Sequence, residues 1–211
     1  MPGPALEPAP APAAAGVAVG FWGKLPTRGD FLRAGLPASF LDPWDVWLSG
    51  ALAASRAILG ERWAAAWREA PIWRFALAPG LAGPEAAIGA LMPSVDRVGR
   101  YFPLTVARVG GPAGSPAGLV AAHGGWLEAA VAAGLAAVME DLAPEALAAR
   151  LAEPGVGEGL APPAEALAAA DPCLWWSEGG PRVAAGWRGG TRLPDGAGFA
   201  AMLREPVESA P

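Results

Sequence analysis

Three short β-prone segments follow one another in the middle of the chain, with no helical pattern between them. They cover residues 72–77, 87–92 and 102–109, and turns that contain Gly or Pro separate them. Strands joined directly by short turns pair antiparallel, whereas parallel neighbours need a long crossover, usually a helix. This run therefore argues against a regular alternation of strand and helix and favours a largely antiparallel sheet.

Along the chain, helices are expected in groups before and after these three strands. Asp42 followed by Pro43 is typical of a helix start, and Gly60 is typical of a helix end. The expected elements, in chain order, are a strand at 17–25, a loop at 27–37, helices at 42–59 and 61–70, the three strands above, helices at 125–142 and 145–151, a mobile Gly/Pro-rich loop at 153–163, strands at 173–177 and 182–187, and a helix at 194–203.

This order, β-αα-βββ-αα-ββ-α, predicts an α+β fold or an α/β/α sandwich. Its sheet is mixed, largely antiparallel and built from about five to six strands, with helices packed on it. The length of 211 residues suits one domain. We place that domain at 17–204, between a disordered Pro/Ala-rich tail at 1–16 and a short tail at 205–211.

Composition excludes several classes of function. The net charge of −5 does not fit a nucleic-acid binder. The chain has one Cys and one His, which are too few for most zinc sites, and no G-x-S-x-G motif is present. We therefore expect no catalytic residues, no metal and no cofactor. The N-terminal stretch lacks the basic start of a secretory signal, and no apolar segment is long enough to cross a membrane, so a cytoplasmic protein is expected.

Charged residues gather in the stretch GFWGKLPTRGDF at 20–31 and just after it. This stretch contains Lys24, Arg28 and Asp30, and Arg33 follows. The spacing does not match a phosphate-binding loop. One interpretation is a surface loop that presents these charges to a partner. The alternative is local, with Asp30 pairing with Arg28 or capping backbone amides.

A second charged group lies in LMPSVDRVGRYFPLT at 91–105, between two expected strands. It contains Ser94, Asp96, Arg97 and Arg100, and loops of this kind often carry binding residues. A single Asp without a partner base supports no catalytic mechanism. The alternative to binding is an Arg–Asp ion pair that fixes the hairpin.

Arg74 stands in the middle of an otherwise apolar strand, on the face opposite Trp73 and Phe75. Such a side chain needs an acidic partner, and Asp30 or Asp96 would serve. We therefore expect the two charged loops to converge into one patch, with Arg74 beneath it. A buried ion-pair network made from the same residues remains the structural alternative.

Six stretches together resemble the TagF family (also called ImpM), whose members are encoded with bacterial type VI secretion systems. The resemblance runs from about residue 17 to residue 203. It is carried by GFWGKLPTRGDF (20–31), PWDVWL (43–48), PIWRFALAPG (71–80), LMPSVDRVGRYFPLT (91–105), LWW (174–176) and LPDGAGFAAML (193–203).

The resemblance implies an accessory protein of type VI secretion that acts after translation as a repressor, through contact with the forkhead-associated scaffold protein Fha. It also implies that the chain is not an enzyme. Two alternatives remain, a structural assembly factor without a repressor role and an enzyme of unknown chemistry. The polar positions in the matching stretches are Lys24, Arg28, Asp30, Arg74, Ser94, Asp96, Arg97 and Arg100, and which of them touch a partner is our inference.

Overall fold

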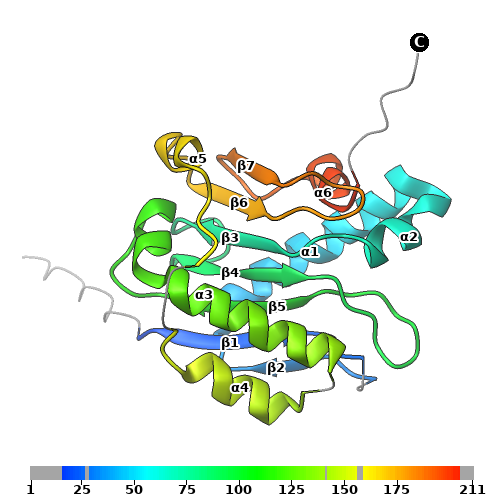
Figure 1. Cartoon of the computed structure of the whole chain (residues 1–211), viewed down its shortest axis with the longest axis horizontal. Coiled ribbons are helices and arrows are strands. Elements are labelled where there is room, and N and C mark those ends of the chain that lie inside the picture. Colours follow the sequence, from blue (N-terminus) through cyan, green and yellow to red (C-terminus); the bar gives the residue numbers. More distant parts are fainter. Residues whose placement is uncertain (1–15, 27–28, 141, 156–158, 205–211) are drawn as a thin grey trace, which may run out of the picture.

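The fold is built around one antiparallel sheet. The computed structural model describes residues 16–26, 29–140, 142–155 and 159–204. The strands within these residues are β1 (Ala18–Gly23), β2 (Leu32–Ala34), β3 (Trp73–Leu77), β4 (Ala87–Met92), β5 (Leu104–Val109), β6 (Cys173–Ser177) and β7 (Gly186–Gly190). They lie in the order β2-β1-β5-β4-β3-β6-β7, and every neighbouring pair is antiparallel (Figure 1).

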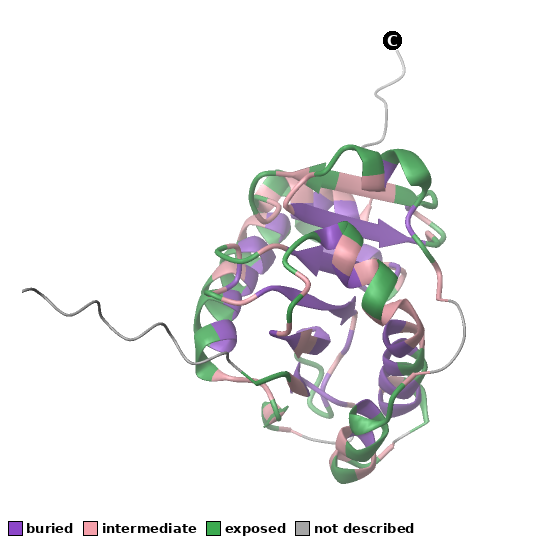
Figure 2. Cartoon of the chain, turned by 90° about the vertical axis from the view of Figure 1, so that its left-hand side faces the viewer, coloured by how far each residue is buried: buried purple, intermediate pink, exposed green. Residues whose placement is uncertain are grey.

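Helices cover both faces of this sheet, which makes three layers (Figures 1 and 2). One face carries α1 (Ala38–Leu59), α2 (Trp63–Arg68) and α6 (Gly196–Leu203), and the other carries α3 (Pro116–Met139) and α4 (Pro144–Ala152). A 3-10 turn (Gly60–Arg62) joins α1 to α2, and a short helix, α5 (Ala164–Ala168), lies near β7. The α+β class predicted from the sequence is confirmed.

Side-chain alternation along the strands divides the core into two halves. On β3, Trp73 and Phe75 pack toward α1, whereas Ala76 packs toward α3. On β6, Trp175 and Trp176 alternate in the same way. Eight of the ten Trp residues are buried and the other two are half-buried, so they form the core rather than exposed interface anchors.

Several predicted element boundaries were wrong, and packing explains one of them while a helix cap explains another. Helix α1 begins at Ala38 rather than at Asp42, so Pro43 lies inside it. Pro43 has no N–H to donate to the preceding turn, and the helix extends upstream of it because Phe40 and Leu41 are buried in the core. Helix α3 begins at Pro116 rather than at residue 125, because Ser115 caps it by accepting a hydrogen bond from the Gly118 amide.

The sheet has seven strands in the described residues, not five to six. The additional strand, β2, lies in the segment predicted as a loop, and three residues are too few to show a period of two. Strand β7 covers Gly186–Gly190, so it overlaps only the end of the predicted 182–187 segment. Its glycines gave no indication of a strand in the sequence, and the strand is defined by its pairing with β6. Helix α5 was not predicted.

The Gly/Pro-rich segment at 153–163 was predicted to be mobile, but its described residues are held against α3. A Cβ atom on Gly155 or Gly159 would overlap the α3 backbone around Gly124 to Trp126. The indole of Trp176 also donates a hydrogen bond to the Leu160 carbonyl at 2.8 Å. Glycine is required here because the loop backbone touches the helix directly.

Helix α3 is the one helix of the described residues that is long and apolar enough to cross a membrane, by length and composition alone. It packs instead against β4, β5 and β3. Gly134 allows this close approach, since a side chain there would overlap the end of Met92. The apolar character of α3 is thus used in covering the sheet.

Candidate functional site

The two loops singled out by the sequence lie next to each other at one end of the sheet. The first follows β1 and leads to β2, and the second joins β4 to β5. Strands β1 and β5 are antiparallel neighbours in the sheet, with Trp22 opposite Thr105. The loop that follows β1 and the loop that precedes β5 therefore lie at the same end of the strands. Their convergence, expected from the sequence, follows from this strand order.

Asp96 is the centre of the contact between the loops. Its Oδ2 accepts hydrogen bonds from Lys24 Nζ at 2.7 Å and from Arg100 Nε at 2.6 Å. Its Oδ1 accepts bonds from the backbone amides of Val98 at 3.0 Å and of Arg100 at 2.8 Å. Four donors therefore hold one carboxylate whose side chain is fully buried. The Arg–Asp ion pair that was expected to fix the hairpin is present.

These donors determine the charge state of Asp96. Burial alone would raise the pKa of this carboxyl, but the hydrogen bonds from Lys24, Arg100 and the backbone outweigh burial and lower the pKa well below its usual range. Asp96 is thus firmly ionised at neutral pH. A carboxylate held in this way serves as an anchor and is a poor proton acceptor.

Ser94 is a second structural link between the loops. Its hydroxyl donates to the Lys24 carbonyl at 2.8 Å, and its own carbonyl accepts a bond from the Trp67 indole at 3.0 Å. Ser94 and Lys24 are both buried. The residues inside the contact therefore form the buried network that the sequence left as an alternative, and a partner cannot reach them directly.

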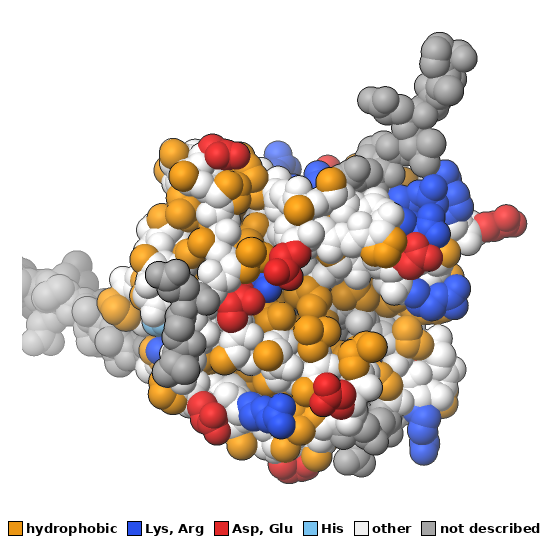
Figure 3. Space-filling model, in the orientation of Figure 1, with side chains coloured by type: hydrophobic (Ala, Val, Ile, Leu, Met, Phe, Trp, Pro, Cys, Tyr) orange, Lys and Arg blue, Asp and Glu red, His pale blue; other side chains and the backbone are white. Residues whose placement is uncertain are grey.

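The exposed surface above this network is formed by Phe31, Arg97, Val98 and Arg100, which we call the loop patch. Phe31 is 51% exposed and Val98 is 64% exposed. The side chain of Arg100 is 58% exposed, and it also donates a hydrogen bond to the Gly29 carbonyl. Figure 3 shows Lys and Arg side chains gathered on the side of the molecule where the β4–β5 loop and α2 lie, at the right of the view.

Phe31 is rigid although it is half exposed. Its ring stacks on Trp22 at a centroid distance of 5.8 Å and meets the edge of Phe102 at 4.7 Å. The Lys24 ammonium lies 4.6 Å from its centre, within cation–π range. Sequence reasoning missed Phe31 and Val98 because it followed charge, and the signal that could have found them is an aromatic residue inside a loop rich in Gly and Pro.

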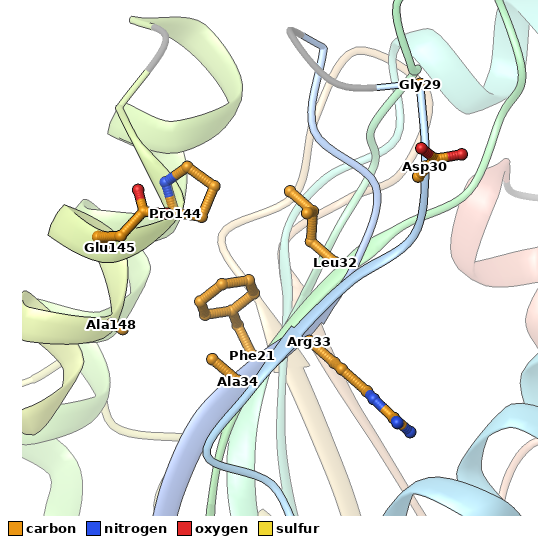
Figure 4. Close-up of a pocket in the computed structure, with 9 residues that line it drawn as sticks. All are labelled: Phe21, Gly29, Asp30, Leu32, Arg33, Ala34, Pro144, Glu145 and Ala148. Atoms are coloured by element: carbon orange, nitrogen blue, oxygen red, sulfur yellow. The ribbon is translucent and has the colours of Figure 1, made fainter.

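The remaining candidates do not join this patch. Asp30 is exposed near the start of β2 and lines a groove beside α4. Arg33 is exposed and extends away from that groove (Figure 4). Arg28 lies outside the described residues. Asp30 and Arg33 therefore both border the groove beside α4.

Arg74 was expected to pair with Asp30 or Asp96, and this was wrong. It points to the opposite face, where Nε and Nη2 donate to the two carboxylate oxygens of Glu128 on α3 at 2.6 and 2.7 Å. Glu178 lies 3.7 Å from the same guanidinium. Glu128 could not be chosen from the sequence because no local pattern shows which helix covers β3.

Two features of the described residues concern metal binding and thiol chemistry. No group of three or more His, Cys, Asp or Glu side chains there could hold a metal ion. Cys173 is buried, and burial raises its thiol pKa to about 11, so it would be a poor nucleophile at neutral pH. The geometry of the loop patch is suited to contact with another macromolecule.

Comparison with known proteins shows the family to which the chain belongs. A family model for the TagF N-terminal domain, described as type VI secretion system-associated, matches residues 20–153. The crystal structure of PA0076 from Pseudomonas aeruginosa PAO1 is 38% identical in sequence, with a TM-score of 0.74, and the match covers 92% of this chain and 97% of PA0076. A search of curated proteins found no match. The family match includes both loops of the patch.

Proposed function

We propose, from the premise that this chain belongs to the TagF family of type VI secretion-associated proteins, that it regulates type VI secretion after translation. In this proposal it acts in the cytoplasm by binding the forkhead-associated scaffold protein Fha, and the binding represses assembly or firing. The loop patch is the docking surface. Family membership by itself gives only the association with the secretion system. Repression and binding to Fha are our proposal.

The observation that carries the proposal is the state of Phe31. A half-exposed aromatic ring that is already fixed by Trp22, Phe102 and Lys24 loses little conformational freedom when a partner covers it. Aromatic and Arg side chains dominate the energetics of protein interfaces. Phe31 and Arg100 provide both types, and both are linked to Lys24, since Phe31 lies under its ammonium and Arg100 shares its partner Asp96.

Charge supports the same surface. Of the four residues of the loop patch, Arg97 and Arg100 are cations and none is acidic. The loop patch thus carries positive charge in a chain whose net charge is −5. Such local complementarity orients a partner and selects an acidic one. We therefore expect the scaffold to offer an acidic surface with an apolar recess for Phe31.

Calorimetric titration of the full chain with the purified Fha protein tests the docking. The substitutions Phe31→Ser and Arg97→Glu should each weaken binding by about tenfold to a hundredfold. Arg97 is exposed, so Arg97→Glu should melt close to wild type. Phe31→Ser should melt somewhat earlier but still cooperatively, because it loses the ring contacts with Trp22 and Phe102. Arg192→Glu is a matched control, because Arg192 is also exposed but lies in the loop between β7 and α6. If the two patch variants bind normally, the docking surface is elsewhere.

Repression needs a separate measurement in cells that carry the secretion system. Overproduction of the wild-type chain should reduce effector release, and overproduction of Arg97→Glu should reduce it much less. If Arg97→Glu loses scaffold binding but still represses release as strongly as wild type, repression does not depend on this contact. If the wild-type chain leaves release unchanged, the assembly-factor alternative is favoured.

A further inference from the structure

A groove of about 530 Å³ lies between the edge of the sheet and α4. It borders the loop patch at Gly29, whose carbonyl accepts a hydrogen bond from Arg100. Its sheet side is formed by Phe21 on β1 together with Leu32 and Ala34 on β2, and Pro144 and Ala148 face them from α4 (Figure 4). Phe21 is 2% exposed, so the groove has an apolar floor that is already packed into the core. A groove of this size can take one or two side chains.

Strand β2 is the last strand of the sheet on this side. Within the described residues it pairs with β1 alone, so its outer edge is not covered by another strand. Edge strands present backbone N–H and C=O groups that can pair with an added strand. The open edge and the apolar groove lie side by side, which is the arrangement used when an extended peptide adds to a sheet and places alternate side chains in pockets.

The charges around the groove select the kind of peptide. Asp30 and Glu145 both line the groove and both are exposed. Arg33 also borders it, but its side chain extends away from Leu32 and Phe21 (Figure 4). Two of the three charged residues that line the groove are thus acidic, whereas the loop patch carries only positive charge.

We propose that this groove binds an extended segment of another protein, which adds to the free edge of β2. The segment places small apolar side chains against Leu32, Ala34 and Ala148, and its Lys or Arg side chains pair with Asp30 and Glu145. Backbone hydrogen bonds to a three-residue strand are few, so most of the selectivity comes from the groove and its two carboxylates.

A second copy of the chain fits the groove less well. A two-fold contact between two β2 edges would bring the same residues of both copies into one interface. The Asp30 and Glu145 carboxylates of each copy would then share that interface, and like charges close together oppose pairing. The inference does not rest on the proposed function, because the groove and the loop patch use different side chains.

Two synthetic octapeptides test the inference by nuclear magnetic resonance titration of the labelled full chain. One alternates Lys with Val, and the other alternates Glu with Val. The Lys peptide should shift the amide signals of Leu32, Arg33, Ala34 and Ala148, and it should bind about tenfold more tightly than the Glu peptide.

Two kinds of variant test which residues bind the peptide: one reverses the charges that line the groove, and the other fills the groove. Asp30→Lys combined with Glu145→Lys should reverse the peptide preference, and both residues are exposed, so folding should be unaffected. Ala148→Trp should fill the groove and abolish the shifts at β2. Glu165→Lys, which makes half of the double variant's charge change on the exposed surface of α5, should leave binding as in wild type.

Three results would overturn the inference. The first is equal binding of the two peptides, and the second is shifts that lie away from β2 and α4. The third is a dimer of the wild-type chain in sedimentation experiments that becomes a monomer in the Ala148→Trp variant. The groove would then be occupied by a second copy of the chain. None of these results depends on whether the chain binds the scaffold protein.

Discussion

Lys24 and Asp96 lie 72 positions apart in the chain, yet the Nζ atom of Lys24 is 2.7 Å from Oδ2 of Asp96. Only 5% of the Lys24 side chain and none of the Asp96 side chain is exposed to solvent. This buried ion pair ties the loop after β1 to the loop between β4 and β5. Together with the hydrogen bond from the Ser94 hydroxyl to the Lys24 carbonyl, it holds the two loops in contact.

Removing one partner of this pair should destabilise the protein strongly. Lys24→Met or Asp96→Asn leaves a buried group without its counterpart, and each should lower the melting temperature by on the order of 10 °C. The double variant should lower the melting temperature by less than the sum of the two single effects, because neither charge is then left without the other. Scanning calorimetry measures all three, and Arg97→Gln is the exposed control. Strictly additive losses would mean that Lys24 and Asp96 do not interact.

The same pair predicts how stability depends on acid. The folded-state pKa of Asp96 is lowered, mainly by hydrogen bonds that outweigh burial. A lowered carboxyl pKa contributes stability that is fully present above the unfolded value of about 3.9 and is lost as the pH falls towards the folded value. Urea melts should therefore show wild type losing more stability than Asp96→Asn as the pH falls below about 4. Parallel pH curves would contradict this.

The pair between Arg74 and Glu128 should have a similar effect on the other face. Arg74 is 2% exposed, and both of its bonds to Glu128 are shorter than 2.8 Å. Arg74→Met should cost about 3 kcal/mol of unfolding free energy, because it leaves Glu128 without its main partner where α3 meets β3. Adding Glu128→Leu should restore part of that loss. Urea melts test this, and a wild-type midpoint for Arg74→Met would contradict it.

Two glycines should respond to the same substitution with opposite signs. Gly50 lies inside α1, and a Cβ atom there would meet no other atom, so Gly50→Ala should stabilise the protein by about 0.5 to 1 kcal/mol. Gly89 lies in the central strand β4, where a Cβ atom would overlap the Val106 carbonyl of β5 and come within 2.7 Å of Phe75. Gly89→Ala should therefore cost about 1 to 3 kcal/mol. Matched urea melts compare the two, and equal effects would mean that strand spacing does not constrain Gly89.

Local patterns predicted the elements that have strong local signals. The strands 87–92 and 173–177 matched β4 and β6 without a shift, because apolar and aromatic runs bounded by turn residues are distinctive. Strand β2 escaped prediction because it is defined by pairing with β1, and a pairing partner is not visible in three residues. The start of α1 was misplaced because Asp42 and Pro43 are a strong local signal that tertiary packing overrides.

Sequence alone was sufficient for the fold class, the family resemblance and the conclusion that Arg74 needs an acidic partner, since each of these depends on patterns within short stretches. It could not choose between Asp96 and Glu128 as that partner, and it could not separate buried charges from exposed ones. The partner of Arg74 and the burial of each charged residue depend on the strand order and on which helix covers each face of the sheet. Long-range packing brings Lys24 to Asp96, seals that pair from water and leaves Phe31 and Arg97 on the surface.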